Sequence, residues 1–334
     1  MQKVLKFNSI YKEKIWGGRK LENLGRTIPP GKIGEAWEIS DYGADISIVE
    51  NGELKGKSLR ECFLQYRTDI FGDAFKNDTS FPLLVKIIDA EDKLSVQVHP
   101  DDEYAKNYDP TNKGKKESWI LLDASDTAEI VCGFKRSLTR NEYIELIQNN
   151  NAEEPLYYRK TEKGDIFLIE AGTVHAIGPG NLILEVQQSS DSTYRVYDYG
   201  RLGDDGKPRV LHLDKALDVL NYKRSINSEI LKPIKIQSMP IERYLLTSNN
   251  KFRIEKFTIL KDTVLPNMYT TPAFHILTVL DGEIEIEDLI IKKCDTVLLS
   301  ASSIKDGVFC KVKSKAEIAY YGSGTDWLIP SGVF

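Results

Sequence analysis

The sequence predicts a mainly β protein made of two jelly-roll units in tandem, with helical insertions in the first unit. Between residues 82 and 200, short apolar runs alternate with turns rich in Gly, Asp, Asn or Pro, which is the pattern of short strands. A second strand-rich segment follows after about residue 235. Many short strands at this spacing favour a double-layered barrel. The predicted domains are therefore residues 1–235 and residues 236–334.

The strands of the first unit are expected at the apolar runs PLLVKII, KLSVQVH, SWILLD, AEIVCG, GDIFLIEAG, NLILEVQQ and YRVYDYG. A helix is expected over 58–71, where S-L-R-E has the spacing of a capping box. Apolar residues at helical spacing predict two more helices, over 137–150 and 212–223. A short helix should follow His99, because Pro-Asp-Asp suits a helix start. The second unit has the expected strands FRIEKFTIL, FHILTVLDGEIEIEDLIIKK, DTVLLSA and AEIAYYG.

Composition and charge are those of an ordinary globular chain. Of the 334 residues, 41% are hydrophobic and 28% charged, and the formal net charge is −5. The basic residues are scattered, which argues against nucleic acid or an anionic membrane as the main partner. No segment has the apolar length of a signal peptide or of a membrane-spanning helix. The four cysteines form no C-x-x-C pair, so free thiols in a cytoplasmic protein are expected.

Four side chains are candidates for binding a metal. Gln97 and His99 lie two residues apart in LSVQVHPDD, so on a strand they share one face and the valines share the other. Glu117 begins the next strand, and His175 lies among turn-forming glycines in GDIFLIEAGTVHAIGPG. Imidazole nitrogens with amide and carboxylate oxygens suit a borderline divalent ion, most plausibly zinc. A structural role for each histidine is the competing interpretation.

Longer stretches around these residues resemble a known family. FPLLVKIIDAEDKLSVQVHPDD, KKESWIL and GDIFLIEAGTVHAIGPGNLILEVQQSSDSTYRVYDYGR, with the earlier IWGGRKL and GEAWEISD, resemble short bacterial type I mannose-6-phosphate isomerases of the cupin class. The resemblance covers most of residues 1–225. It implies one zinc ion per chain and interconversion of mannose 6-phosphate and fructose 6-phosphate. The residues that it implicates are the zinc ligands Gln97, His99, Glu117 and His175, the catalytic Arg195, the substrate or phosphate contacts Lys86, Ser95 and Lys115, and the acidic Asp191.

The cupin pattern shows departures in both units, and the second unit departs further. In the first unit Glu170 stands where proline is usual. In the second unit Cys294 replaces the motif glycine, and Lys305 falls at the position of the metal-binding histidine. An ammonium group has no lone pair for a metal, so this unit is expected to be metal-free and the solitary His275 to be structural. His212, at the start of a predicted helix, is also expected to be structural.

Isomerisation of an aldose to a ketose moves a proton between C1 and C2, so charge on the enediolate oxygens must be stabilised. Arg195 is always charged and is a poor base. The base stays open among Lys115, Glu117, Asp191 and a metal-bound hydroxide. The alternatives are another metal-dependent cupin enzyme, such as an oxygenase or a different sugar-phosphate isomerase, and a non-enzymatic sugar-binding cupin. Arg195 together with Lys115 favours the isomerase, because a passive binding module needs neither. The expected partner is a small sugar phosphate, and the expected oligomeric state is a monomer or a homodimer.

Overall fold

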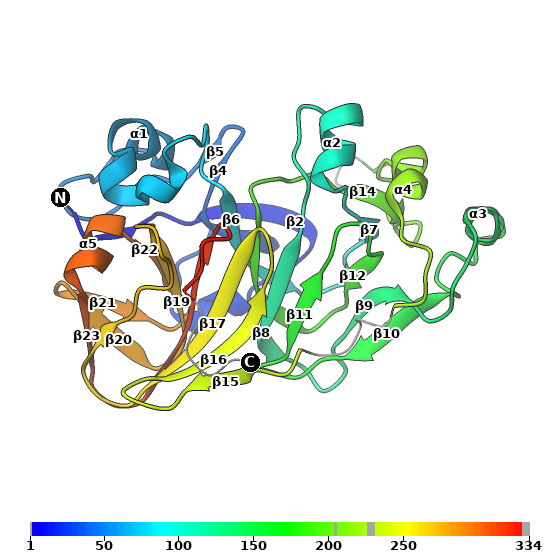
Figure 1. Cartoon of the computed structure of the whole chain (residues 1–334). Coiled ribbons are helices and arrows are strands. Elements are labelled where there is room, and N and C mark those ends of the chain that lie inside the picture. The colour runs from blue at the N-terminus through cyan, green and yellow to red at the C-terminus, as the bar shows by residue number, and fades with distance from the viewer. Residues whose placement is uncertain (1, 204–205, 226–230, 329–334) are drawn as a thin grey trace. The chain divides into compact units, whose positions relative to one another are not determined.

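The computed structural model of the chain is mainly β (Figure 1), and it describes residues 2–203, 206–225 and 231–328. The chain divides into two compact units. We call them the central unit, Tyr11–Trp37 and Leu84–Leu231, and the composite unit, Met1–Ile10, Glu38–Leu83 and Lys232–Phe334. Among the described residues, no helix combines the length and the apolar character needed to cross a membrane.

Two sheets form the central unit. The first has the strand order β11 (Ile166–Ile169), β8 (Glu117–Ala124), β13 (Asn181–Gln188), β6 (Leu83–Ala90), β2 (Ile10–Gly18) and β3 (Ile33–Ile39). The second has the order β10 (Leu156–Lys160), β9 (Glu129–Phe134), β12 (His175–Ile177), β7 (Val96–Val98) and β14 (Tyr194–Tyr197). Side chains from both sheets, among them Trp119 and Ile177, share one hydrophobic core, which is the arrangement of a jelly roll.

Helices cover the other face of the second sheet. Val96 and Val98 of β7 pack in a separate core with side chains of α3 (Arg140–Gln148) and α4 (Leu213–Val219). Because side chains alternate along a strand, Gln97 between the two valines faces the core that the sheets share. The alternation expected from the sequence is therefore present, and it directs the polar residues of this strand into the barrel.

Capped first turns explain why the predicted helices form. In α3 the Thr139 hydroxyl accepts a hydrogen bond from Glu142 N, and the Glu142 carboxylate accepts one from Thr139 N. The helix expected after His99 is α2 (Asp102–Tyr108), capped by the side chain of Asp101. A short 3-10 turn, η1 (Lys20–Leu24), completes the helical elements described in this unit.

The composite unit holds the second jelly roll. Its larger sheet has the order β1 (Val4–Lys6), β22 (Thr296–Leu299), β19 (His275–Asp281), β24 (Ala316–Ser323), β17 (Phe252–Ile259), β16 (Glu242–Ser248) and β15 (Ile234–Gln237). Its smaller sheet has the order β18 (Thr263–Leu265), β23 (Val308–Val312), β20 (Glu283–Ile286) and β21 (Leu289–Lys292). The remaining elements are β4 (Asp41–Tyr42), β5 (Asp45–Ile46), α1 (Leu59–Gln65), the π turn η2 (Arg67–Phe71), the 3-10 turn η3 (Asp73–Phe75) and α5 (Ala301–Asp306). The predicted fold class, mainly β with two jelly-roll units, is confirmed.

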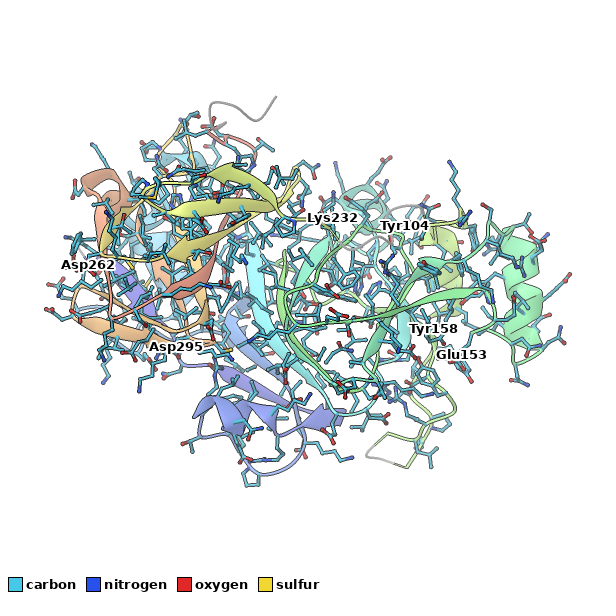
Figure 2. All side chains as sticks on the ribbon, turned by 90° about the horizontal axis from the view of Figure 1, so that it is seen from below. Tyr104, Glu153, Tyr158, Lys232, Asp262 and Asp295 are labelled. Carbon is cyan, nitrogen blue, oxygen red and sulfur yellow. The ribbon has the colours of Figure 1, made fainter. Side chains whose placement is uncertain are left out.

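Two N-terminal segments group differently from the predicted division of the chain. The first strand, β1, pairs with β22, and Lys6 on β1 forms an ion pair of 3.2 Å with Asp295, which Figure 2 labels. Residues 38–83, which include the predicted helix at α1, join the same unit through ring contacts such as that between Phe71 and Phe274, with centroids 5.9 Å apart. The third segment of the composite unit begins at Lys232. All four cysteines are buried, and none of them forms a disulfide among the described residues.

Candidate active site

Three of the predicted metal ligands meet in the interior of the central unit. His99 follows β7, His175 begins β12 and Glu117 begins β8, and all three are buried. The two imidazole Nε2 atoms are 3.1 Å apart. The Glu117 carboxylate lies 3.5 Å from His99 Nε2 and 3.4 Å from His175 Nε2. Within the described part of the chain, no other three His, Cys, Asp or Glu side chains come close enough to share an ion.

Backbone carbonyl groups fix the tautomers of both histidines. Nδ1 of His99 lies 2.6 Å from the carbonyl oxygen of Ser192, and Nδ1 of His175 lies 2.8 Å from that of Thr173. Because a carbonyl oxygen only accepts, each Nδ1 donates and each Nε2 presents a lone pair. Two facing lone pairs are stabilised by a cation, and Oε1 of Glu117 is buried without a hydrogen-bond partner. This donor set therefore fits a divalent metal such as zinc.

Gln97 and Lys115 complete the surroundings of the three ligands. Gln97 is directly opposite His175 in the pairing of β7 and β12, so the two side chains lie on the same face. The Lys115 ammonium donates to His99 Nε2 over 3.0 Å and contacts the Glu117 carboxylate. Lys115 is buried as well. It therefore supplies a positive charge where the donor atoms converge.

Burial and neighbouring charges set the protonation of this cluster. Burial lowers the pKa of His99, and the Lys115 charge lowers it further. Burial, with His99 beside it, lowers the pKa of His175 to about 3. Burial alone would raise the pKa of Glu117, but Lys115 and the two histidines bring it well below its usual value. At neutral pH the cluster therefore consists of neutral imidazoles and a carboxylate, which are the protonation states that bind metal.

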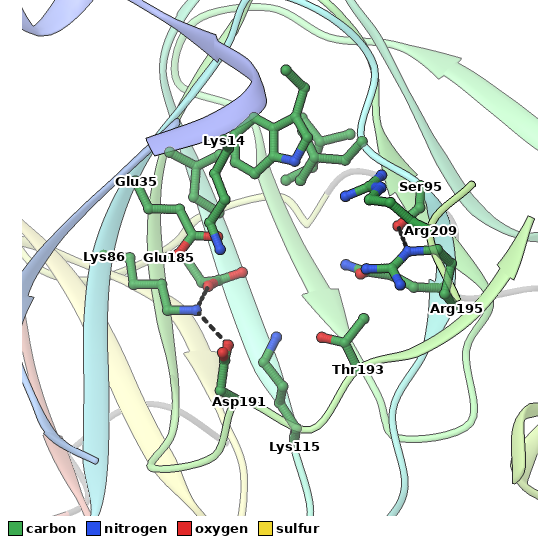
Figure 3. A pocket seen from close by; sticks show the side chains of 15 residues that line it. Lys14, Glu35, Lys86, Ser95, Lys115, Glu185, Asp191, Thr193, Arg195 and Arg209 are labelled. Carbon is green, nitrogen blue, oxygen red and sulfur yellow. Dashed lines mark hydrogen bonds and ion pairs between the residues drawn. The ribbon is translucent and has the colours of Figure 1, made fainter. Parts of the chain in front are cut away.

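A pocket of about 260 Å³ has Gln97 and Lys115 in its wall (Figure 3). All the residues predicted for catalysis or substrate contact line this one cavity: Lys86, Ser95, Lys115, Asp191 and Arg195. The charged lining comprises five cationic and three anionic side chains, namely Lys14, Lys86, Lys115, Arg195, Arg209, Glu35, Glu185 and Asp191. The excess of positive charge suits an anionic ligand.

One side of the pocket is a group of carboxylates around Lys86 (Figure 3). The Lys86 ammonium is buried, 3.3 Å from Asp191 and 3.7 Å from Glu185. It also lies 4.8 Å from the centre of the Trp37 ring. Burial alone would lower the pKa of Lys86, but the carboxylates, Glu35 first among them, raise it, so the ammonium stays charged. Lys86 therefore holds Asp191 and Glu185 in place as well as facing the cavity.

Glu185 on β13 is a candidate residue that the sequence interpretation missed. It is buried, and its Oε1 accepts a hydrogen bond of 3.0 Å from the Trp119 indole. Burial, with the Glu117 charge, raises the pKa of Glu185 to about 7. A carboxyl group that titrates near neutral pH in a pocket has the properties of a general acid–base. The signal in the sequence was an acidic residue inside the apolar run NLILEVQQ, on the strand face that also carries Ile183.

Arg195 lies on another side of the pocket, with Ser95, Thr193 and Arg209 (Figure 3). Arg195 Nε donates to Ser95 Oγ over 3.2 Å, and Nη1 donates to the carbonyl oxygen of Val210 over 2.8 Å. Burial and then the charge of Arg209 lower the pKa of Arg195, yet a guanidinium stays protonated at neutral pH. The lining residues without a recognised sequence signal are Lys14, Glu35, Thr193 and Arg209.

His212 and His275 belong neither to the cluster of His99, Glu117 and His175 nor to the lining of this pocket, which includes no histidine. His212 Nδ1 accepts a hydrogen bond of 3.1 Å from the backbone N–H of Arg195. His275, in the composite unit, is buried, stacks against Tyr320 and accepts a hydrogen bond of 3.0 Å from Met268 N. These contacts are of the kind that structural residues make.

Comparisons with known proteins identify the family of this chain. A family model described as the catalytic domain of type I phosphomannose isomerase matches residues 4–136. A probable mannose-6-phosphate isomerase of Bacillus subtilis is 44% identical over 212 residues, which are 63% of this chain and 66% of that relative. The mannose-6-phosphate isomerase of Streptococcus mutans is 36% identical over 292 residues, which are 86% of this chain and 89% of that relative.

A solved structure extends the likeness to the fold. The crystal structure of mannose 6-phosphate isomerase from Bacillus subtilis matches with a TM-score of 0.85 and 32% identity, covering 96% of this chain and 100% of that one. The relative from Streptococcus mutans is likewise matched over most of its length. The chain therefore belongs to the type I phosphomannose isomerase family of enzymes.

Proposed function

We propose that the protein interconverts mannose 6-phosphate and fructose 6-phosphate, using one zinc ion per chain. The observation that carries this proposal is the convergence of His99, Glu117 and His175 next to a pocket in which cationic side chains outnumber anionic ones. Family membership supplies the reaction class. Gln97 is the fourth ligand of the proposed set, because it lies opposite His175 and lines the pocket.

The proposed reaction requires that negative charge on the sugar oxygens be stabilised while a proton moves between neighbouring carbons. The metal, when bound, supplies a Lewis acid for the oxygens at C1 and C2 of the open-chain sugar. Arg195 carries a permanent charge and a rigid set of donors, which suits it to bind an anionic oxygen and not to take a proton. The proposed path is removal of a proton from one carbon, an enediol intermediate, and return of the proton to the adjacent carbon.

Among the possible bases we favour Glu185. It lines the same pocket as Arg195, and burial, with the Glu117 charge, raises its pKa to about 7 in the metal-free chain, which suits a group that accepts and returns a proton. Lys115 contacts the Glu117 carboxylate, and Glu117 itself belongs to the proposed ligand set. Burial alone would raise the pKa of Asp191, but the Lys86 charge leads in lowering it, which makes Asp191 the weaker base.

We further infer that residues 236–334 act in stability and bind no metal. His275 is enclosed by Tyr269 and Tyr320, with ring centroids 5.0 Å away in both cases. Burial lowers the pKa of His275 to about 3. The residues at the other motif positions, Cys294 and Lys305, offer a buried thiol and an ammonium group, and neither completes a ligand set with His275.

A coupled assay with mannose 6-phosphate tests the proposal. The protein with zinc should form fructose 6-phosphate, a chelator should abolish the activity, and added zinc should restore it. The His175→Ala variant should lose both bound metal and activity while its circular dichroism stays that of a folded protein. The His275→Ala variant, which also removes a buried imidazole, is the matched control and should keep both. Zinc-loaded wild-type protein that leaves mannose 6-phosphate unchanged would refute the proposal.

A further inference from the structure

We propose that Arg209 binds the phosphate group of the substrate beside Arg195, and that Asp198 holds Arg209 in position. This inference rests on the proposed function and adds to it a residue that selects phosphorylated over free sugars. Both arginines line the pocket, and Figure 3 shows them across it from Lys86 and its carboxylates.

The segment that follows Arg209 is hydrogen-bonded to β14, the strand of Arg195. Arg195 Nη1 donates to the carbonyl oxygen of Val210 over 2.8 Å. The backbone N–H of His212 donates to the carbonyl oxygen of Arg195 over 2.8 Å, and Arg195 N donates to His212 Nδ1 over 3.1 Å. These bonds hold Arg209, the residue before Val210, next to Arg195 at the wall of the pocket.

Asp198 fixes the direction of the Arg209 side chain. Its buried carboxylate accepts a hydrogen bond of 2.7 Å from Arg209 Nε and a second from Arg209 Nη2. One edge of the guanidinium is therefore taken up by a bidentate contact, a geometry that arginine favours with carboxylates. Arg209 Nη1 has no hydrogen-bond partner among the described residues, and the side chain is 21% exposed. Donor capacity therefore remains for a ligand in the pocket.

Positive charge exceeds negative charge on this side of the pocket. The Asp198 carboxylate also accepts a hydrogen bond of 2.7 Å from Arg201, so one carboxylate serves two guanidinium groups. The guanidinium group of Arg195, over the described residues, donates only to neutral oxygen atoms. Arg201 also lies 3.5 Å from the carboxylate of Asp92, so the three guanidinium groups of Arg195, Arg201 and Arg209 outnumber the two carboxylates near them. The charge of Arg209 lowers the pKa of Arg195, which means that the two groups repel one another until an anion lies between them.

A phosphate group meets these requirements better than a sugar hydroxyl does. It carries close to two negative charges and three acceptor oxygens, which match the donor forks of two arginines. The Lys86 side of the pocket has no such excess of positive charge, because the carboxylates of Glu35, Glu185 and Asp191 there balance the ammonium groups of Lys14, Lys86 and Lys115. A sugar phosphate held by Arg195 and Arg209 therefore directs its uncharged carbons toward the remaining lining of the cavity.

Steady-state kinetics of zinc-loaded Arg209→Ala and Arg209→Lys variants test the assignment. In Arg209→Ala, KM for mannose 6-phosphate should rise about 10- to 100-fold, the loss expected for hydrogen bonds to a charged group. The kcat value should stay close to wild type, because the contact binds substrate and transition state alike. Arg209→Lys should recover only part of the loss, since the charge remains but the fork does not. Calorimetric affinity for inorganic phosphate should fall in parallel.

Arg140→Ala is the matched control, because it removes a guanidinium paired at the surface with Asp218 and remote from the pocket lining. It should leave KM and phosphate affinity unchanged. Wild-type KM and phosphate affinity in Arg209→Ala would overturn the assignment of Arg209, as would a fall in kcat at unchanged KM. If Arg209→Ala does not fold, the KM of Arg209→Lys tests the assignment instead: a KM above that of the wild type supports it, and a wild-type KM overturns it. Wild-type protein that binds phosphate through Arg209 but does not isomerise mannose 6-phosphate would refute the proposed function alone.

Discussion

Replacing Lys115 by methionine should destabilise the metal-free protein strongly. The Lys115 ammonium contacts the Glu117 carboxylate, and the two residues are 4% and 0% exposed. Methionine fills a similar volume without a charge, so Glu117 would keep only the two neutral imidazoles as near neighbours. Removing one partner of a buried ion pair costs about 3–5 kcal/mol. At about 2 °C per kcal/mol for a chain of this size, Tm should fall by about 6–10 °C.

The dependence of this stability change on bound metal and on pH distinguishes loss of the Lys115 charge from a simple loss of packing. Bound zinc supplies positive charge to Glu117, so most of the lost Tm should return when the Lys115→Met variant is loaded with metal. In the metal-free wild type, the pKa of Glu117 is lowered, so its contribution to stability is lost as the pH falls through that lowered value. In the metal-free variant, burial acts unopposed and raises the pKa of Glu117. Stability should then fall as the pH rises through the raised value.

Thermal unfolding with a chelator and with zinc, at several pH values, measures these changes. Lys116→Met is the matched control: its ammonium pairs over 2.7 Å with Glu170, whose side chain is 42% exposed, so little change is expected. If metal-free Lys115→Met unfolds within about 2 °C of the wild type, a shift equivalent to about 1 kcal/mol, then Lys115 does not compensate Glu117. That result would refute the claim that the Lys115 charge stabilises the buried Glu117 carboxylate.

Three further predictions concern the chemistry and the composite unit. Glu185→Gln should keep its metal but lose about 100-fold or more in kcat, the usual effect of removing a general base; an unchanged kcat would exclude Glu185 from proton transfer. Turnover in deuterated water should place solvent deuterium in the product, whereas complete retention of the C2 hydrogen over many turnovers would favour a hydride shift. His275→Ala should cost about 1–3 kcal/mol in unfolding free energy because the ring is buried, without changing kcat or metal content. Loss of a second metal ion per chain in that variant would contradict the metal-free assignment.

The shared strand face of the proposed metal ligands Gln97 and His99 could be predicted because strand geometry is a local property. In V-Q-V-H the two-residue period directs Gln97 and His99 to one face, and the structure has the valines packed against helices on the other. Glu185 follows the same two-residue period on its strand. It was missed because a single acidic residue in an apolar strand commonly has only a structural role. Arg209 could not be found in this way. Its position depends on backbone hydrogen bonds to β14, a strand well before it in the chain.

Helices and units show the same contrast between local and long-range information. The capping box at Ser58 predicted a helix start correctly, because a cap involves residues only three apart. The capping box at Thr139 was not recognised in the sequence, where only apolar spacing predicted that helix. The end of the first predicted helix was less regular, since α1 gives way to the π turn η2. The partner of β1 was not predictable, because the pairing of distant strands depends on register and packing across the whole unit. The predicted oligomeric state stays a prediction.

The pairing of β1 with β22 has a consequence for biosynthesis. Val4 lies opposite Leu299, so β1, which is synthesised first, can pair with β22 only after nearly the whole chain has been synthesised. At about 5–20 residues per second, this interval on the ribosome lasts some tens of seconds. Throughout that time β1 exposes unpaired backbone groups, which are a template for association with other nascent chains. The central unit has its own sheets and core from Tyr11 to Leu231, and it can collapse before the composite unit is closed.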